Sequence, residues 1–353
     1  MTSFVERCDA CEFQDEILSL FNRNGQPLPR QHFDWYYGHN GNATVLSWVL
    51  RGAADRPIVG LCSVVPRTFR FGDRLVRAGV VGNLMVDKDS RGIGGVALLR
   101  CVQSLVSNKH FDILLGIPTL GPPMRLILRM GFRTIARWRT YVQIFRSRAS
   151  LYARYATAGA ALSPLVDLVA ALRRRFSSFR EGSTANFMLE ELTRDQVTRL
   201  PVASWPPLDG CFLADFSTGL LESRFFQEPL EDYRFIGIVH RQDDSVRGYL
   251  VVDCRRGRVI VCHCRTDLQI LSEADAILSL CRDGKEYGET FGVITLRGSS
   301  LSKVLERSGF IRLPPKFGGN EHSLVGFWRP DHPLAQDFAL PSRWNVFPGF
   351  NDV

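Results

Sequence analysis

Two segments far apart in the chain repeat one local pattern. Met124–Arg133 and Leu301–Ile311 each carry a short helical sequence that runs into Gly-Phe, directly after a buried strand pattern. Recurrence of such a unit, with similar elements around it, indicates internal duplication of one fold. The 353 residues are enough for two domains, each with its own core. The repeat therefore restricts the chain to two similar parts in tandem.

The first part, residues 1–146, is called the N-terminal half. Apolar spacing predicts short helices at Glu12–Asn22 and Gln31–Tyr37, and no regular element is expected before them, around Cys8. Three antiparallel strands follow at 44–50, 57–71 and 75–86, with a hairpin turn at Gly72-Asp73. The remaining elements are predicted as a helix at 94–107, a strand at 111–117, a helix at 124–130 and strands over 132–145.

Residues 186–353, the C-terminal half, return to a similar order. Strands are predicted at 186–191, 234–240, 248–264, 291–296 and 324–328, and helices at 217–226, 271–282 and 301–307. The predicted fold class is α+β, with two tandem domains that each hold a central mixed, mostly antiparallel sheet flanked by helices.

The segment between the halves, residues 147–185, is rich in Ala and Leu and ends in three consecutive arginines, Arg173 to Arg175. It is interpreted as an interdomain helix and linker, packed between the domains with its arginines in solvent. A basic amphipathic helix that lies on a membrane surface is the alternative.

The charge balance limits the class of partner. Forty-four Lys and Arg against 36 Asp and Glu give a net charge of +8, which suits nucleic acid, an acidic membrane surface or a phosphorylated small molecule. No nucleic-acid-binding motif accompanies the arginines, and no run of about 18 uncharged apolar residues could span a bilayer. We therefore expect a small-molecule partner and no nucleic acid, with a membrane surface only as the alternative given for residues 147–185.

Cysteine usage favours a reducing compartment. The nine cysteines are odd in number and spread over both halves, unlike the disulfide framework of a small secreted domain. Met1–Gln14 carries acidic residues where an export signal needs a basic stretch and then an apolar one. Cys262-His263-Cys264 does not have the usual zinc-hairpin spacing, and Cys8 of Cys8-x-x-Cys11 lies at a start where no regular element is expected, so no metal is expected. The chain is predicted to be cytoplasmic.

A glycine-rich loop is the sharpest local signal. A strand ends near Val86, the loop Arg91-Gly92-Ile93-Gly94-Gly95 follows, and an apolar helix begins. Backbone N–H groups in such a loop, together with the positive end of the helix, can bind phosphate oxygens, although glycine also serves any tight turn. The absence of Gly-Lys-Ser/Thr excludes a Walker motif, and the antiparallel strand before the loop argues against a dinucleotide motif.

The loop and its neighbours resemble the GNAT superfamily of acyl-CoA-dependent N-acyltransferases. Arg91, Gly94 and Val96 fall on the three positions of the family's pyrophosphate loop, and Met130-Gly131-Phe132 matches its widespread Leu-Gly-Phe. The resemblance covers the N-terminal half, with a degenerate second copy at about 186–330. It implies acetyl-CoA or another acyl-CoA as co-substrate, held by Leu84, Met85, Val86, Arg91, Gly92, Ile93, Gly94, Gly95, Val96 and Thr119.

The second copy lacks the loop. Arg265–Ile270 follows its corresponding strand and contains no glycine, so it cannot form the same phosphate cradle. One coenzyme site is therefore expected, in the N-terminal half, with the C-terminal half shaping the acceptor pocket or acting as a scaffold. Trp35, Tyr36 and Tyr37 are candidate substrate-binding residues, and division between core and surface is the alternative.

The resemblance implies direct attack of a neutral amine on the thioester, with backbone N–H groups of Leu84 to Val86 stabilising the oxyanion. The Tyr that many family members use to protonate the thiolate is replaced by Ile127. Four candidates remain for handling the amine proton, one of them as the start of a water chain. These are Asp87, His39, Asp352 and, for the water chain, Asn83.

The tandem layout, with Trp35-Tyr36-Tyr37 ahead of the strands and a closing 344–352, resembles two-domain GNAT proteins found with surface-polysaccharide biosynthesis. An amino sugar linked to a nucleotide is therefore the expected acceptor. Another amine, such as a peptide, polyamine or amino acid, is the first alternative. A non-catalytic binding module is the second, because loss of chemistry would explain both Ile127 in place of the Tyr and Val96 where the family's loop has Gly or Ala. A homodimer is left open.

Overall fold

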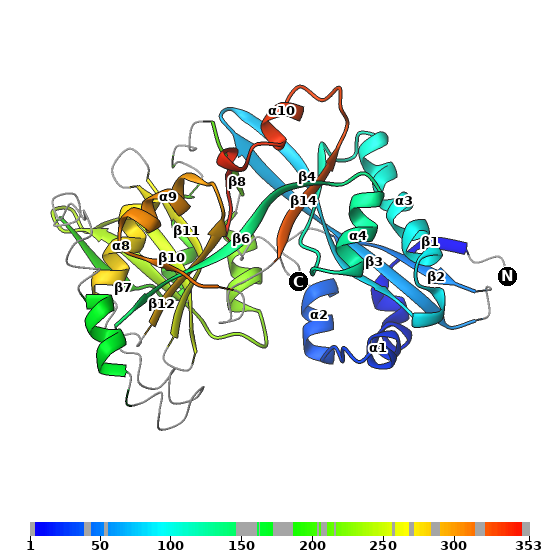
Figure 1. Cartoon of the computed structure of the whole chain (residues 1–353), viewed down its shortest axis with the longest axis horizontal. Coiled ribbons are helices and arrows are strands. Elements are labelled where there is room, and N and C mark those ends of the chain that lie inside the picture. The colour runs from blue at the N-terminus through cyan, green and yellow to red at the C-terminus, as the bar shows by residue number, and fades with distance from the viewer. Residues whose placement is uncertain are drawn as a thin grey trace.

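The computed structural model describes residues 4–38, 44–52, 56–145, 161, 163–171, 186–202, 205, 210–214, 217–255, 258–267, 272–283, 290–314 and 322–347. Their strands form one continuous mixed sheet with helices on its faces (Figure 1). The α+β class is thus confirmed. The boundaries of the two halves stay a prediction, since most of 147–185 lies outside the described residues and only 163–171 is seen as a helix.

The N-terminal half follows the predicted order closely. Its helices are α1 (Gln14–Arg23), α2 (Arg30–Gly38), α3 (Ile93–Ser107) and α4 (Pro122–Arg129). Its strands are β2 (Leu46–Arg51), β3 (Ile58–Phe71), β4 (Arg74–Val86), β5 (Ile113–Gly116) and β6 (Arg133–Ile144). The β3–β4 hairpin turns at Gly72, whose φ of +58° suits glycine.

The expectation of no element at the start was wrong. Phe4–Cys8 forms β1, which pairs antiparallel with β2 from Phe4 opposite Arg51 to Cys8 opposite Ser47. Glu6 and Arg7 interrupt the apolar alternation of this edge strand, so its sequence gives no clear strand signal.

The C-terminal half keeps most of the predicted order, but the strand predicted at 248–264 is two antiparallel strands, Ser245–Arg255 and Arg258–Thr266, with Arg256-Gly257 between them in the sequence. Its longer strands are β7 (Phe187–Glu191), β9 (Tyr233–His240), β10 (Ser245–Arg255), β11 (Arg258–Thr266), β12 (Thr290–Leu296) and β14 (Ser323–Trp328). Helices include α6 (Arg194–Thr198), α7 (Thr218–Leu221), a π-helix at Glu222–Phe226, α8 (Glu273–Asp283), α9 (Ser300–Arg307) and α10 (Ala335–Phe338). Short strands β8 (Phe212–Ala214), β13 (Ile311–Arg312) and β15 (Trp344–Asn345) complete the sheet.

The halves exchange their last strands. The sheet order runs β1-β2-β3-β4-β5-β14-β6-β12-β11-β10-β9-β7, so β14 lies beside β5 of the other half. Strand β6 pairs with β14 through Arg133–Arg137 and with β12 through Trp138–Ile144. Each half therefore completes the sheet edge of the other, and the two cannot separate without breaking strand pairs (Figure 1).

Side chains from both halves also share one hydrophobic core. It contains Trp35, Phe69 and Trp138 together with Phe212 and Tyr249, all buried. A second core packs α3 and α4 on the sheet of the N-terminal half, and a third packs α8 and α9 on the sheet of the C-terminal half. Among the described residues, no helix is long and apolar enough to cross a bilayer.

Candidate active site in the N-terminal half

Of the two parallel strands of the N-terminal half, one ends before the other. Strands β4 and β5 pair from Ala78 opposite Ile113 to Val81 opposite Gly116. Strand β5 ends there, while β4 continues to Val86. Backbone groups of β4 beyond Val81 thus have no partner in β5 and are available to a ligand on that side.

A β-bulge falls on this free stretch of β4. Leu61 of β3 lies opposite Met85, but Ser63 lies opposite Gly82, so β4 carries one residue more than β3 in this interval. Asn83 takes up the extra length with a φ of +49°, a left-handed conformation that asparagine tolerates better than most residues. The bulge turns the backbone and re-aims the Asn83 side chain.

A chain of polar side chains lies behind the bulge. The Asn83 amide donates to the Tyr37 hydroxyl at 3.2 Å, and the Tyr37 and Ser63 hydroxyls are 3.0 Å apart. Ser47 extends the chain at 3.4 Å from Ser63. Burial raises the pKa of Tyr37 far above its usual value, and the bonds to Ser63 and Asn83 only partly oppose it. Tyr37 is therefore a neutral phenol that fixes the orientation of Asn83.

Trp35 and Tyr36, the other two aromatic residues predicted to bind substrate, pack inside the protein. Trp35 and Tyr36 are 4% and 1% exposed and belong to the shared core. The Trp35 indole donates to the Ser223 carbonyl at 2.7 Å, and the Arg224 guanidinium lies 5.2 Å from its ring centre. Helix α2 thus bonds to the β4 bulge through Tyr37 and to the C-terminal half through Trp35.

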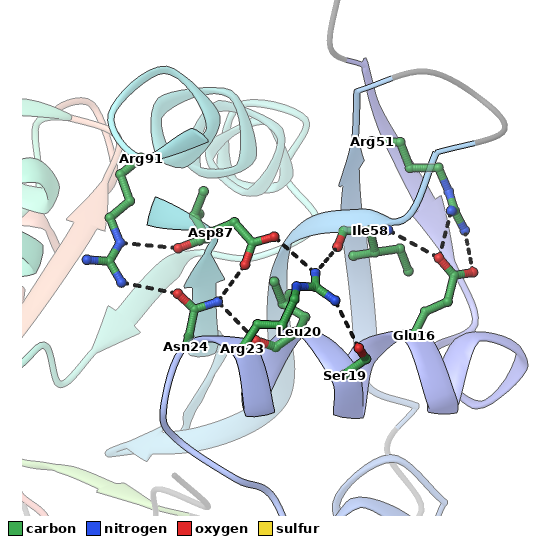
Figure 2. A network of polar contacts seen from close by, with 10 residues as sticks. Glu16, Ser19, Leu20, Arg23, Asn24, Arg51, Ile58, Asp87 and Arg91 are labelled. Atoms are coloured by element: carbon green, nitrogen blue, oxygen red, sulfur yellow. Dashed lines mark hydrogen bonds and ion pairs between the residues drawn. The ribbon is translucent and has the colours of Figure 1, made fainter. Parts of the chain in front are cut away.

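A polar network anchors the loop after β4 to the end of α1 (Figure 2). Arg91 donates to the Val86 carbonyl at 3.3 Å and to the Asn24 side chain at 3.1 Å. Asn24 and Arg23 donate to the two carboxylate oxygens of Asp87, at 2.8 and 3.0 Å. Both Asp87 oxygens are thus engaged. The geometry makes Asp87 an anchor of the loop, although it was also a candidate base.

Helix α3 begins without a side-chain cap. Gly92 precedes it with a φ of +88°, and a Cβ there would meet nothing within 4 Å, so the space in front of it is open. The N–H groups of the first helical residues, Ile93, Gly94 and Gly95, have no intrahelical acceptor by position. The Val96 N–H is used in the helix, donating to the Gly92 carbonyl at 3.0 Å.

Two glycines of the loop serve packing. A Cβ on Gly94 would lie 2.5 Å from Leu50 Cδ2, and a Cβ on Gly95 would lie 2.8 Å from Leu126 Cδ2. Both residues are buried, whereas Ile93 between Gly92 and Gly94 is 82% exposed. Glycine at 94 and 95 therefore lets α3 approach β2 and α4, and what these residues offer a ligand is confined to their N–H groups.

The remaining predicted residues divide as follows. Met85 and Val86 are buried and Leu84 is half-buried on the free stretch of β4, while Thr119 is exposed in the loop before α4. His39 and Asp352 lie outside the described residues. Within the described part of the chain, no three His, Cys, Asp or Glu side chains gather as a metal site would require.

The corresponding place in the C-terminal half is closed. Strands β11 and β12 also pair in parallel, up to Val261 opposite Val293, and a bulge follows at Cys262. Next to it, His263 is 3% exposed, and its Nε2 lies 3.2 Å from the Tyr249 hydroxyl. Burial, aided by the charge of Arg265, lowers the His263 pKa from 6.5 to about 3.

Aromatic side chains surround His263. The rings of Phe225 and Phe347 lie 6.3 and 6.1 Å from the imidazole, and the buried Arg265 donates to the Trp205 carbonyl at 3.2 Å. Protein side chains thus fill the surroundings of this second bulge, and a neutral imidazole lies directly after it.

Comparison with known proteins rests on structure. No protein-family model matches the sequence, and no curated protein is similar enough to count as a match. A protein of unknown function from Enterococcus faecalis superposes with a TM-score of 0.60 at 9% identity, over 92% of this chain and 72% of that one. A GCN5-related N-acetyltransferase (GNAT) from Kribbella flavida gives 0.56 at 14% identity, over 92% and 71%. The chain has the GNAT fold.

A further GNAT-like match is the N-myristoyltransferase of Saccharomyces cerevisiae, solved with bound myristoyl-CoA. Its TM-score is 0.54 at 14% identity, and the match covers 97% of this chain and 90% of that one. At such identities the likeness is one of fold. The structural comparison supports the GNAT resemblance seen in the sequence.

Sequence patterns missed the residues that support the GNAT loop and bulge. Ser47 and Ser63 are fully buried polar residues in the apolar strands β2 and β3, and that contrast was a usable signal. Arg23 and Asn24 are residue types that are common at the end of a surface helix. Nothing in the sequence therefore linked them to Asp87 and Arg91.

Proposed function

We propose that the chain is an acyl-CoA-dependent N-acyltransferase that transfers an acetyl or other short acyl group to a primary amine. One observation carries this proposal. The stretch of β4 after Val81, which has no partner in β5, and the uncapped start of α3 at Gly92 are joined by the short anchored loop that holds Asp87. The shared fold with N-acetyltransferases and with an N-myristoyltransferase supports it.

The residues present fit a diphosphate group of coenzyme A. The N–H groups of Ile93, Gly94 and Gly95 at the positive end of the 15-residue helix α3 would donate to the diphosphate, and Arg91 adds a positive charge. The backbone of Leu84 to Val86, which has no partner in β5, would pair with the rest of the coenzyme. When bound, the acyl-CoA supplies an activated thioester carbonyl, whose oxyanion these N–H groups could stabilise.

We propose that Asn83 receives the amine, directly or through a water molecule. Tyr37 is neutral and hydrogen-bonded on both sides, so it holds Asn83 in position without carrying charge. The Asn83 side chain would orient the amine or a bound water by hydrogen bonding, and the amine proton would leave through water to solvent. His39 and Asp352 remain candidate bases on sequence grounds, and the engaged carboxylate of Asp87 is not proposed as one.

The acceptor proposed for first testing is an amino sugar linked to a nucleotide, on the ground of the tandem layout. Peptides, polyamines and amino acids are the alternatives. The C-terminal half would act through α2, because Ser223 and Arg224 contact Trp35, two residues before Tyr37.

Thiol release from acetyl-CoA tests the proposed reaction. We expect thiol release above background with one class of amine. Its rate should rise with pH as the amine loses its proton and should not fall again at high pH. Coenzyme binding without thiol release for any amine would identify a non-catalytic binding module. Absence of binding at millimolar acetyl-CoA would overturn the proposal altogether.

A further inference from the structure

Two arginines lie opposite each other where the two halves share the sheet. Strand β6 of the N-terminal half pairs antiparallel with β12 of the C-terminal half, up to Trp138 opposite Leu296. The register continues by one residue, because the Arg297 N–H donates to the Arg137 carbonyl at 2.8 Å. Directly opposed residues in antiparallel strands point to the same face of the sheet, so the exposed side chains of Arg137 and Arg297 are neighbours.

This arrangement brings like charges together. Like charges directly opposite each other on neighbouring strands are destabilising. Neither the Arg137 nor the Arg297 guanidinium forms an ion pair or a hydrogen bond with a residue that the structure describes. Arg139, half-buried, follows on the same face of β6 and adds a third positive charge. An anion bound between the two exposed guanidinium groups would relieve this repulsion.

Buried hydroxyl groups lie next to the arginine pair. Ser323 of β14 is opposite Arg137 on its other side and is 1% exposed. Thr295, two residues before Arg297, is also 1% exposed, and its Oγ1 lies 3.4 Å from the Oγ of Ser299. Hydroxyl groups are rarely placed in the buried part of a sheet without a polar neighbour. The sheet is therefore polar around the two arginines.

The arginine pair and the free stretch of β4 lie past the same end of β5. Strands β4, β5 and β6 run in one direction, with β14 antiparallel between β5 and β6. Strand β5 ends at Gly116, level with Thr134, whereas β4 and β6 both continue, and Figure 1 shows β6 running from one half into the other. Three strand spacings, roughly 14 Å, separate Arg137 from β4 across the sheet.

We propose that Arg137 and Arg297 together bind a phosphate group of a small molecule. A guanidinium donates two parallel N–H bonds to a phosphate, and two opposed arginines can hold one phosphate or diphosphate between them. The two residues come from different halves, so the pairing of β6 with β12 creates the site. A nucleic acid is a poorer ligand, because two arginines match one phosphate or diphosphate rather than a long backbone. The proposal is independent of the proposed acyl transfer.

Calorimetric titration of the full chain with inorganic pyrophosphate tests the site. The parent protein carries Ile93→Glu, so that a carboxylate at the start of α3 keeps the glycine-rich loop from binding the probe. We expect one pyrophosphate per chain, at least about tenfold weaker binding after Arg137→Gln or Arg297→Gln, and no measurable binding after both. Without ligand, Arg297→Gln should melt at a slightly higher temperature than the parent, because the repulsion is removed.

A matched control removes the same charge elsewhere. Arg74→Gln with Arg258→Gln replaces two exposed arginines at the starts of β4 and β11, far along the strands from the site, and should leave pyrophosphate binding unchanged. Equal loss in this control would reduce the effect to net charge and overturn the proposal. So would no pyrophosphate binding by the parent, or tight binding of single-stranded RNA that the double arginine variant abolishes.

Acetyl-CoA titration identifies the source of the phosphate. In the chain without Ile93→Glu, a tenfold loss of acetyl-CoA affinity after Arg137→Gln with Arg297→Gln would assign the bound phosphate to the coenzyme. Unchanged acetyl-CoA affinity would assign it to another phosphorylated molecule, such as the acceptor. Pyrophosphate binding needs no reaction, so it stands even if no amine releases thiol, and the two proposals can fail separately.

Discussion

The two halves place different residues at the same point of one fold. Each has a parallel strand pair that ends just before a bulge in the longer strand. In the N-terminal half the bulge carries Asn83 and precedes an anchored loop and an uncapped helix. In the C-terminal half it is followed by His263, buried among aromatic rings. In the N-terminal half the end of β4 has no partner in β5 and α3 has no side-chain cap, whereas in the C-terminal half aromatic side chains surround the residue after the bulge.

Acid should lower the free energy of unfolding because His263 is buried in its neutral form. Its folded pKa of about 3 lies below the ordinary 6.5, so the unfolded chain takes up a proton that the folded chain refuses. Stability from this group is full above pH 6.5 and falls as pH drops towards 3. From pH 6.5 to 5 the expected loss is about 2 kcal/mol.

Urea unfolding at pH 6.5 and 5 measures that loss. His263→Gln keeps a hydrogen-bonding group for Tyr249 but cannot take up the proton, so its stability should depend less on pH by about that amount. Equal pH dependence in both proteins would show that His263 does not sense acid.

Substitutions of Tyr37 and Tyr249 compare the two halves in their effect on kcat. Each hydroxyl bonds to the side chain at or beside its bulge, Asn83 in one half and His263 in the other. Tyr37→Phe should lower kcat about tenfold with little change in coenzyme affinity, because it frees the Asn83 side chain. Tyr249→Phe should leave kcat unchanged and cost about 1 kcal/mol of stability. Equal effects on kcat would remove the distinction between the halves.

Asp87→Asn tests whether the engaged carboxylate is an anchor or a base. The Asp87 and Arg23 side chains are 23% and 39% exposed, so solvent screening limits the expected loss of stability to about 1 kcal/mol. Coenzyme affinity should fall because the loop loosens, while the pH profile of kcat keeps its shape. A collapse of kcat at unchanged affinity and stability would instead assign Asp87 as the base.

Sequence patterns predicted the elements well because apolar periodicity is local. Helices α1 to α4 and strands β2 to β6 all lie within a few residues of the predicted positions. The strand exchange could not be predicted, because β14 would show the same apolar pattern beside β5 as beside β12. Likewise, the sequence marked Gly94 and Gly95 as phosphate contacts, whereas their neighbours Leu50 and Leu126 are brought to them only by the fold.

The position of the backbone loop at the candidate site could be predicted from the sequence, whereas the contacts of most of its side chains could not. The loop from Arg91 to Gly95 follows from a local signature. The roles of Trp35 and Tyr37 depend on which face of α2 contacts which half of the chain. The two residues lie only two positions apart, so the sequence could not tell which belongs to the core and which bonds to Asn83. The partners of Asp87 come from α1, more than sixty residues away in the chain.

Calorimetric titration with acetyl-CoA tests the single coenzyme site most directly. Ile93→Glu places a carboxylate at the exposed start of α3, where it favours the helix but repels phosphate. Ile93→Gln is its neutral control, and Ser300→Glu places the same charge at the start of α9 in the C-terminal half. The account predicts one site per chain, at least about tenfold weaker binding in Ile93→Glu, and unchanged binding in Ser300→Glu. Two sites per chain, or equal loss in both charged variants, would contradict it.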